Sequence, residues 1–153
     1  NSKAVSDWEF VPSARRFEIG GTSNYPGAIA LGETLELVNE IGVENIEKYI
    51  FDLTTYCLDM YESIGGTAIT HRDADHRSGI VITRLYDDLA VDRDILKKLH
   101  ARKIFIAQRF TDRVGGFRNS CQYFNNKKDI DALRDALLEI INEIGRAPDY
   151  KKN

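Results

Sequence analysis

The chain has 153 residues, 42% of them hydrophobic, which is enough for one domain with a buried core. Its 21 basic and 24 acidic residues nearly cancel, so nucleic acid is not an expected partner. No apolar run approaches the roughly 18 residues of a membrane helix, and no signal-peptide pattern is present. We therefore expect a soluble, cytoplasmic protein with no membrane partner, in which Cys57 and Cys121 stay reduced.

Residues 1–25 are expected to form an extended lead-in and a glycine-rich turn. In the stretch Arg16–Leu31, glycines precede a cluster of short polar residues, and an apolar helix follows. Gly21 permits close approach to the backbone, and Thr22 offers a hydroxyl that can bond a phosphate oxygen. This is the composition of an anion-binding turn at a helix start, but ordinary loops and helix caps use the same residue types.

Hydrophobic periodicity predicts the elements that follow. Helices are expected over 26–41, 46–64, 92–100 and 127–144, with Asp92 capping the third and Asn126 and Asp129 forming a capping box on the fourth. Strands are expected over 67–70, 78–85, 104–109 and 117–121, with a loop over 110–116. Short connections favour a mostly antiparallel sheet, so we predict an α+β fold, a two-layer sandwich with helices on one face. Residues 26–145 would form this domain, and 146–153 a flexible tail.

The segment Phe117–Asn126 leads from a predicted strand into a capped helix. Alternation along the strand puts Arg118 and Ser120 on the face opposite Phe117 and Asn119. An arginine on a rigid strand is suited to bidentate binding of a carboxylate. The alternative is a surface arginine with a solvated tip.

Several motifs occur in an order that resembles a known family. They are Phe17–Asn24, Ile41–Ile46, Arg77–Val81, Arg118–Ser120, Phe124–Asn126 and Asp129–Asp131. Together they resemble the C-terminal part of class V aminotransferases, the fold-type I pyridoxal-phosphate (PLP) enzymes that include cysteine desulfurases, selenocysteine lyases and isopenicillin N epimerase-like proteins. The resemblance runs from about Trp8 to Ile144, nearly the whole chain.

The resemblance implies roles for individual residues. Thr22 would bond the PLP phosphate of the neighbouring subunit in a homodimer, with Gly21 allowing close approach. Arg118 would bind the α-carboxylate of a small amino-acid substrate, in transamination, racemisation or β-elimination. Asn24 and Asn125 match family positions that we interpret as turn and cap residues.

The sequence also departs from the family pattern. Two glycines, Gly20 and Gly21, stand where the pattern has one, and Phe124 replaces a tyrosine. The desulfurases carry a persulfide cysteine in the loop that corresponds to 110–116, and this loop has none, which disfavours a desulfurase.

The family's Schiff-base lysine lies upstream, and no lysine here has its setting. No catalytic residue is therefore expected in this chain, which would be a small domain joined to a PLP-binding large domain and inactive alone.

Two alternatives do not depend on the family. His71, Asp73, Asp75 and His76 crowd one loop and could bind a metal, but a solvated loop is favoured, so no metal is expected. The chain could also be a stand-alone α+β binding or regulatory module that senses a small amino acid through Arg118 without catalysis.

Overall fold

A computed structural model describes residues 9, 12–14, 23–111 and 114–151. The chain divides into two compact units, residues 1–40 and 41–153, and each is described by itself. The first contains all but the last residue of helix α1 (Tyr25–Ile41), which has no buried residue. Asn24 caps it, because its side-chain oxygen accepts a hydrogen bond from the backbone N–H of Gly27 at 3.0 Å. This is the structural role expected for Asn24.

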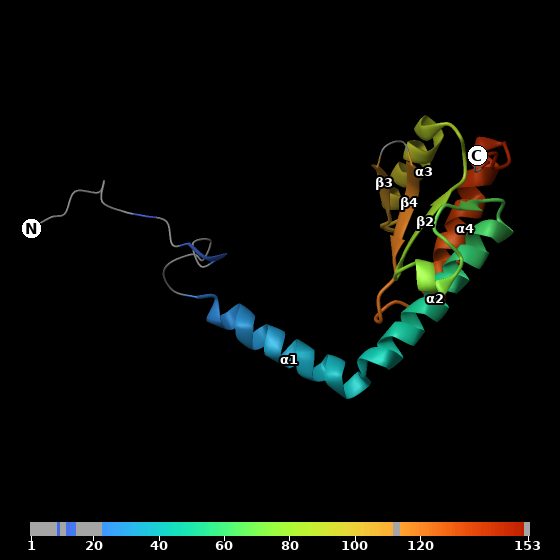
Figure 1. The fold of residues 1–153 in the computed structure, drawn as a ribbon. Helices are drawn as coiled ribbons and strands as arrows, with labels where there is room; N and C mark the ends of the chain where they lie inside the picture. Colours follow the sequence, from blue (N-terminus) through green and yellow to red (C-terminus); the bar gives the residue numbers. More distant parts are fainter. Residues whose placement is uncertain (1–8, 10–11, 15–22, 112–113, 152–153) are drawn as a thin grey trace, which may run out of the picture. The chain divides into compact units, whose positions relative to one another are not determined.

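The second unit is an antiparallel sheet with helices packed against it (Figure 1). Its strands are β1 (Thr67–Ala68), β2 (Ile80–Arg84), β3 (Ala107–Thr111) and β4 (Val114–Ser120), in the order β1-β2-β4-β3. Its helices are α2 (Val43–Ser63), α3 (Leu89–Ala101) and α4 (Lys127–Ile144), with a short 3-10 helix η2 (Ala74–His76). The predicted α+β fold with an antiparallel sheet is confirmed.

The core lies between the sheet and the helices. In β4, Phe117 and Asn119 are buried, whereas Arg118 is half-buried and Ser120 exposed, which confirms the predicted alternation. The helices contribute fully buried side chains to the same cluster, among them Leu58, Tyr61, Ile95, Leu99, Leu137 and Ile140. Arg118 therefore belongs to the strand face that the core does not use.

Helix α4 begins and ends as its sequence predicts. Asn126 and Asp129 form the capping box: Asn126 accepts from the backbone N–H of Lys128 at 2.9 Å, and Asp129 accepts from that of Asn126 at 2.9 Å. Gly145 follows in the left-handed conformation, with φ of 69°. These local signals fix both ends of the helix.

The start of α3 differs from the prediction. Asp88 is the cap, because its side chain accepts from the backbone N–H of Ala90 at 2.8 Å. Asp92, expected to be the cap, lies one turn inside the helix and is buried. The apolar spacing of Val91, Ile95 and Leu99 already extends to the N-terminal side of Asp92 and could have indicated this.

The loop expected over 110–116 is instead a tight hairpin. β3 and β4 pair as far as Thr111 and Val114, so only residues 112–113 join them. Gly115 and Gly116 belong to β4. A side chain at Gly115 has no room there, because a Cβ would collide with the carbonyl oxygen of Arg109 on the paired strand. The prediction was wrong because it took these glycines for loop residues.

The C-terminal segment contacts the second unit as far as it is described. The backbone N–H groups of Asp149 and Tyr150 both donate to the carbonyl oxygen of Leu85, at 3.0 and 3.1 Å. The Arg84 guanidinium lies 4.0 Å from the centroid of the Tyr150 ring. These contacts hold part of the predicted flexible tail against the end of β2.

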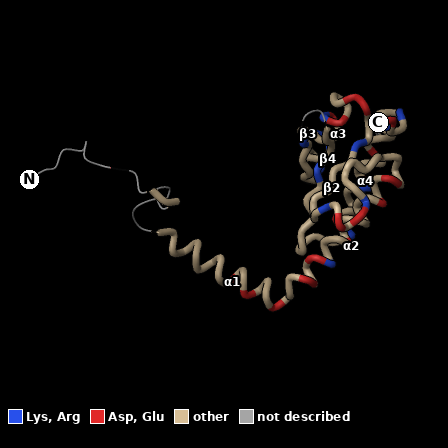
Figure 2. Tube along the Cα trace, viewed as in Figure 1, with Lys and Arg blue, Asp and Glu red and all other residues tan. Residues whose placement is uncertain are grey.

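Charge is mixed over the second unit: Figure 2 shows basic and acidic positions interspersed along its helices and strands. Among the residues that the structure describes, no helix combines the length and apolar character needed to cross a bilayer.

Candidate functional site

A cavity of about 670 Å³ opens beside the end of β4. The pairing of β3 with β4 stops at Ala107 and Arg118, so the residues of β4 beyond Arg118 have no strand on that side. The segment 103–106 and the first turns of α4 line the space instead, together with Arg118, Cys57 and Cys121. We call this space the Arg118 cavity.

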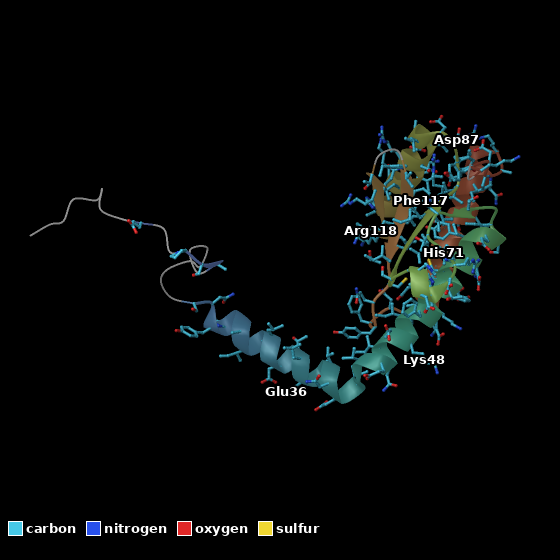
Figure 3. The ribbon with its side chains drawn as sticks, viewed as in Figure 1. Glu36, Lys48, His71, Asp87, Phe117 and Arg118 are labelled. Atoms are coloured by element: carbon cyan, nitrogen blue, oxygen red, sulfur yellow. The ribbon has the colours of Figure 1, made fainter. Side chains whose placement is uncertain are left out.

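Arg118 is held by strands on both sides. Its register partners are Ile82 on β2 and Ala107 on β3, so its backbone lies in the interior of the sheet. Figure 3 labels Arg118 and its neighbour Phe117, which belongs to the core. A charged group mounted on a paired strand is positioned more firmly than one on a loop.

The Arg118 guanidinium is without a partner, since no described residue forms a hydrogen bond or ion pair with it. The other described arginines that are buried or half-buried all have such partners: Arg77, Arg84, Arg102 and Arg134. Arg77, for example, donates to the hydroxyl of Thr55 at 2.6 Å. Among the buried and half-buried arginines that the structure describes, Arg118 is the one whose N–H donors remain available to a ligand.

The turn after β4 is fixed by its own hydrogen bonds. The Asn125 side-chain oxygen accepts from the backbone N–H of Gln122 at 3.0 Å, and its amide nitrogen donates to Asp129 at 3.4 Å. The Tyr49 hydroxyl donates to the Asn125 carbonyl oxygen at 2.8 Å. Asn125 thus makes the turn contacts expected of it and stiffens one wall of the cavity.

Two features of the cavity were missed at the sequence level. Phe105 lines it with 75% of its surface exposed, although the run around it was assigned to a strand. Cys57 and Cys121 both line it. The neighbouring Cys121 thiol and burial raise the pKa of Cys57, and the neighbouring Cys57 thiol lowers the pKa of Cys121. Only the alternation in β4, which puts Cys121 on the core side, hinted at this.

The expected phosphate-binding residues, Gly21 and Thr22, lie outside the described residues. The described part of the cavity offers one free guanidinium in a largely apolar lining, which fits the carboxylate of a small molecule. This donor set does not by itself fit PLP, which needs donors for its phosphate and a lysine for its aldehyde.

The polar loop before β2 brings three of its four candidate metal ligands together. One ligand atom each of His71, Asp73 and His76 lies within 4.8 Å of the others, and Asp75 is not in the group. All three are exposed. The backbone N–H of Asp73 donates to Nδ1 of His71 at 3.1 Å, so the loop's own hydrogen bonds already use one of the two ring nitrogens of His71.

Known proteins match most of this chain. The family model described as aminotransferase class-V matches residues 1–133. A probable cysteine desulfurase of Halalkalibacterium halodurans is 30% identical over 141 residues, which are 86% of this chain and 33% of that protein. A probable cysteine desulfurase of Staphylococcus aureus strain Mu50 is 30% identical over 145 residues, 90% of this chain and 34% of that protein. The chain thus spans about a third of the length of these relatives.

Solved structures share the fold. The apo structure of a cysteine desulfurase from Thermococcus onnurineus NA1 superposes with a TM-score of 0.72 at 17% identity, over 94% of this chain and 37% of that one. A NifS-like protein gives a TM-score of 0.68 at 17% identity, over 81% of this chain and 35% of that one. With the family match over residues 1–133, these likenesses confirm the resemblance found in the sequence, and the chain belongs to the class V aminotransferase family.

Proposed function

We propose that this chain is the small, C-terminal domain of a homodimeric PLP-dependent enzyme that acts on a small amino acid. Arg118 binds the α-carboxylate of the substrate. The large domain of the same polypeptide supplies the lysine that holds the cofactor, so this chain is inactive alone. The observation that carries the proposal is the partnerless Arg118 guanidinium on a strand paired on both sides, at a cavity.

The size and lining of the cavity support a small, partly apolar substrate. Its wall contains apolar side chains from three elements or connections, including Ile104, Ala107 and Leu133. A carboxylate that binds beside such a wall loses bound water. Two parallel N–H donors of one guanidinium offset the free-energy cost of this desolvation. The apolar surroundings strengthen this contact by lowering the local dielectric.

Within the reaction, this chain's part is positioning. PLP, when bound in the whole protein, supplies the electron sink that amino-acid chemistry requires. Arg118 fixes one end of the amino acid, and the apolar wall keeps water from the carboxylate. Gly21 and Thr22 are proposed to bind the cofactor phosphate of the neighbouring subunit.

The hairpin supports transamination, racemisation or β-elimination over cysteine desulfuration. The relatives above are named probable cysteine desulfurases, yet this chain has no cysteine in residues 110–116. The direct pairing of Thr111 with Val114 leaves only two residues to connect the strands. A short link of this kind has little reach with which to carry a sulfur nucleophile to a substrate.

The test replaces Arg118 with alanine and with lysine in the full-length enzyme, assayed with a panel of small amino acids. Loss of a bidentate carboxylate contact should cost about 2 to 4 kcal/mol of binding free energy, seen as a lower kcat/KM that comes mainly from a higher KM. Arg109→Ala is the matched control, because Arg109 is exposed on the adjacent strand and donates only to the Gln108 carbonyl oxygen. An unchanged KM in both Arg118 variants would remove Arg118 from the site.

The stand-alone module remains the second candidate, because the free Arg118 guanidinium would serve an amino-acid sensor equally well. The enzyme-domain and module hypotheses predict different coding sequences upstream of this chain. A frame continuing upstream into a large domain with a lysine in a Ser- and His-containing turn supports the enzyme, and its absence supports the module.

A further inference from the structure

We propose that Cys57 and Cys121 form a redox-sensitive dithiol, which a small hydroperoxide entering the Arg118 cavity converts into a disulfide. The proposal is independent of the enzyme's reaction. It concerns thiols from two different elements, the middle of α2 and the residue directly after β4.

The two cysteines belong to one core cluster, which α2 and the end of β4 share. The Tyr61 hydroxyl donates to Oδ1 of Asn119 at 3.4 Å, which fixes one point of contact between the elements. Cys57 lies one turn before Tyr61 on the buried face of α2, a step of about 6 Å along a helix. Cys121 lies two residues after Asn119 on the same side of the chain, a step of about 7 Å along a strand. The two steps are of similar length, and Cys57 and Cys121 line the same cavity.

A second contact places α2 near Cys121. A Cβ placed on Gly79 would lie 2.6 Å from Cγ2 of Ile50 and 3.7 Å from the carbonyl oxygen of Cys121. Ile50 is two turns before Cys57 on α2, so this helix passes close to Cys121. Both cysteines are free, and both line the cavity.

The two thiols differ in what they can do. Cys57 is 1% exposed and Cys121 7%, so Cys121 is the more accessible from the cavity. This exposure makes Cys121 the thiol that a hydroperoxide in the cavity meets first, and the neighbouring Cys57 thiol lowers the pKa of Cys121 in the same sense. Cys57 is then the resolving thiol.

The oxidation proceeds in two balanced steps. The Cys121 thiolate attacks the outer oxygen of the hydroperoxide, the O–O bond breaks, and an alcohol leaves after taking up a proton. Cys121 is now a sulfenic acid, oxidised by two electrons. The Cys57 sulfur attacks the Cys121 sulfur, the S–O bond breaks, and water leaves with the Cys57 proton. A thiol reductant reverses the result.

The test treats the folded chain with tert-butyl hydroperoxide, blocks remaining thiols with an alkylating agent in denaturant, and maps tryptic peptides. The expected product is a cross-link between peptides 49–72 and 119–127 within one chain, released by dithiothreitol. Cys57→Ala should instead accumulate a dimedone-reactive sulfenic acid on Cys121, and Cys121→Ala should leave Cys57 reduced.

Three outcomes would overturn the proposal. Both cysteines could remain alkylatable in the folded chain at a peroxide dose that oxidises them in the denatured chain. The cross-link could form only between chains. Cys57 could oxidise at an equal rate in Cys121→Ala. If a variant fails to fold, the peptide map of the unsubstituted chain still decides, because it needs no substitution.

Discussion

Arg84 and Asp92 form an ion pair in the interior of the second unit, with Nε of Arg84 3.7 Å from Oδ2 of Asp92 and both side chains buried. Arg84 also donates to the carbonyl oxygens of Tyr86 and Asp87, each at 2.8 Å. Oδ1 of Asp92 accepts from the backbone N–H of Tyr86 at 3.3 Å. The pair thus ties the end of β2 to the first turns of α3.

Removing one member of this pair should be strongly destabilising. Asp92→Ala leaves the Arg84 charge buried without a carboxylate and also removes the acceptor of the Tyr86 N–H. We expect the free energy of unfolding to fall by about 3 to 5 kcal/mol, measured by urea denaturation. Asp94→Ala is the control on the same helix, because the exposed pair of Asp94 with Lys98 is worth about 1 kcal/mol or less. Equal losses in the two variants would show that the buried pair has no special weight.

The pH dependence of stability gives a separate test of Asp92. Burial raises the pKa of this carboxyl from 3.8 to about 6, against the opposing effects of the Tyr86 N–H and of Arg84. Between these values the folded chain holds a proton that the unfolded chain has lost, so stability falls as pH rises through this window. The contribution is fully present below about pH 3.8 and has been lost once pH exceeds about 6.

Asp92→Asn does not titrate and should lack this slope. Urea denaturation of both chains at a series of pH values between about 3.8 and 6 measures the difference. Identical slopes would mean that Asp92 keeps an ordinary pKa in the folded chain.

The capping box of α4 predicts a smaller, local effect. Asn126→Ala removes the side-chain acceptor of the Lys128 N–H and should lower the free energy of unfolding by about 1 kcal/mol. Lys128→Ala is the control, since its exposed side chain takes no part in the box. Thermal or urea unfolding can resolve the two, and an equal change in both would argue against the cap.

The contrast between Asn126 and Asp92 shows which structural features could be predicted from the sequence. The ends of α4 depend on residues within one turn of each other, so the capping box and Gly145 could be predicted. The role of Asp92 depends on Arg84 in another element. Apolar spacing could place Asp92 inside the helix, but nothing in the local sequence identifies the partner of its carboxylate. The same holds for the candidate site. The strand face of Arg118 followed from alternation, whereas its lack of a partner depends on which side chains of other elements lie near its guanidinium.

Gly116 shows how a glycine in a strand can be required by its neighbours. A Cβ at this position would lie 2.2 Å from the carbonyl oxygen of Thr83 and 2.6 Å from Cγ of Arg84, both on the paired strand β2. Backbone cannot move aside as a flexible side chain does, so Gly116→Ala should lower the free energy of unfolding by about 1 to 3 kcal/mol or more. Gly32→Ala is the matched control, because a Cβ there meets nothing within 4 Å and alanine favours the helix. Urea denaturation should find the first variant destabilised and the second unchanged or more stable.

If Gly116→Ala unfolds at the same denaturant concentration as the unsubstituted chain, then β2 and β4 do not approach as closely as their pairing requires. The firm positioning of Arg118, two residues after Gly116, would then lose its support.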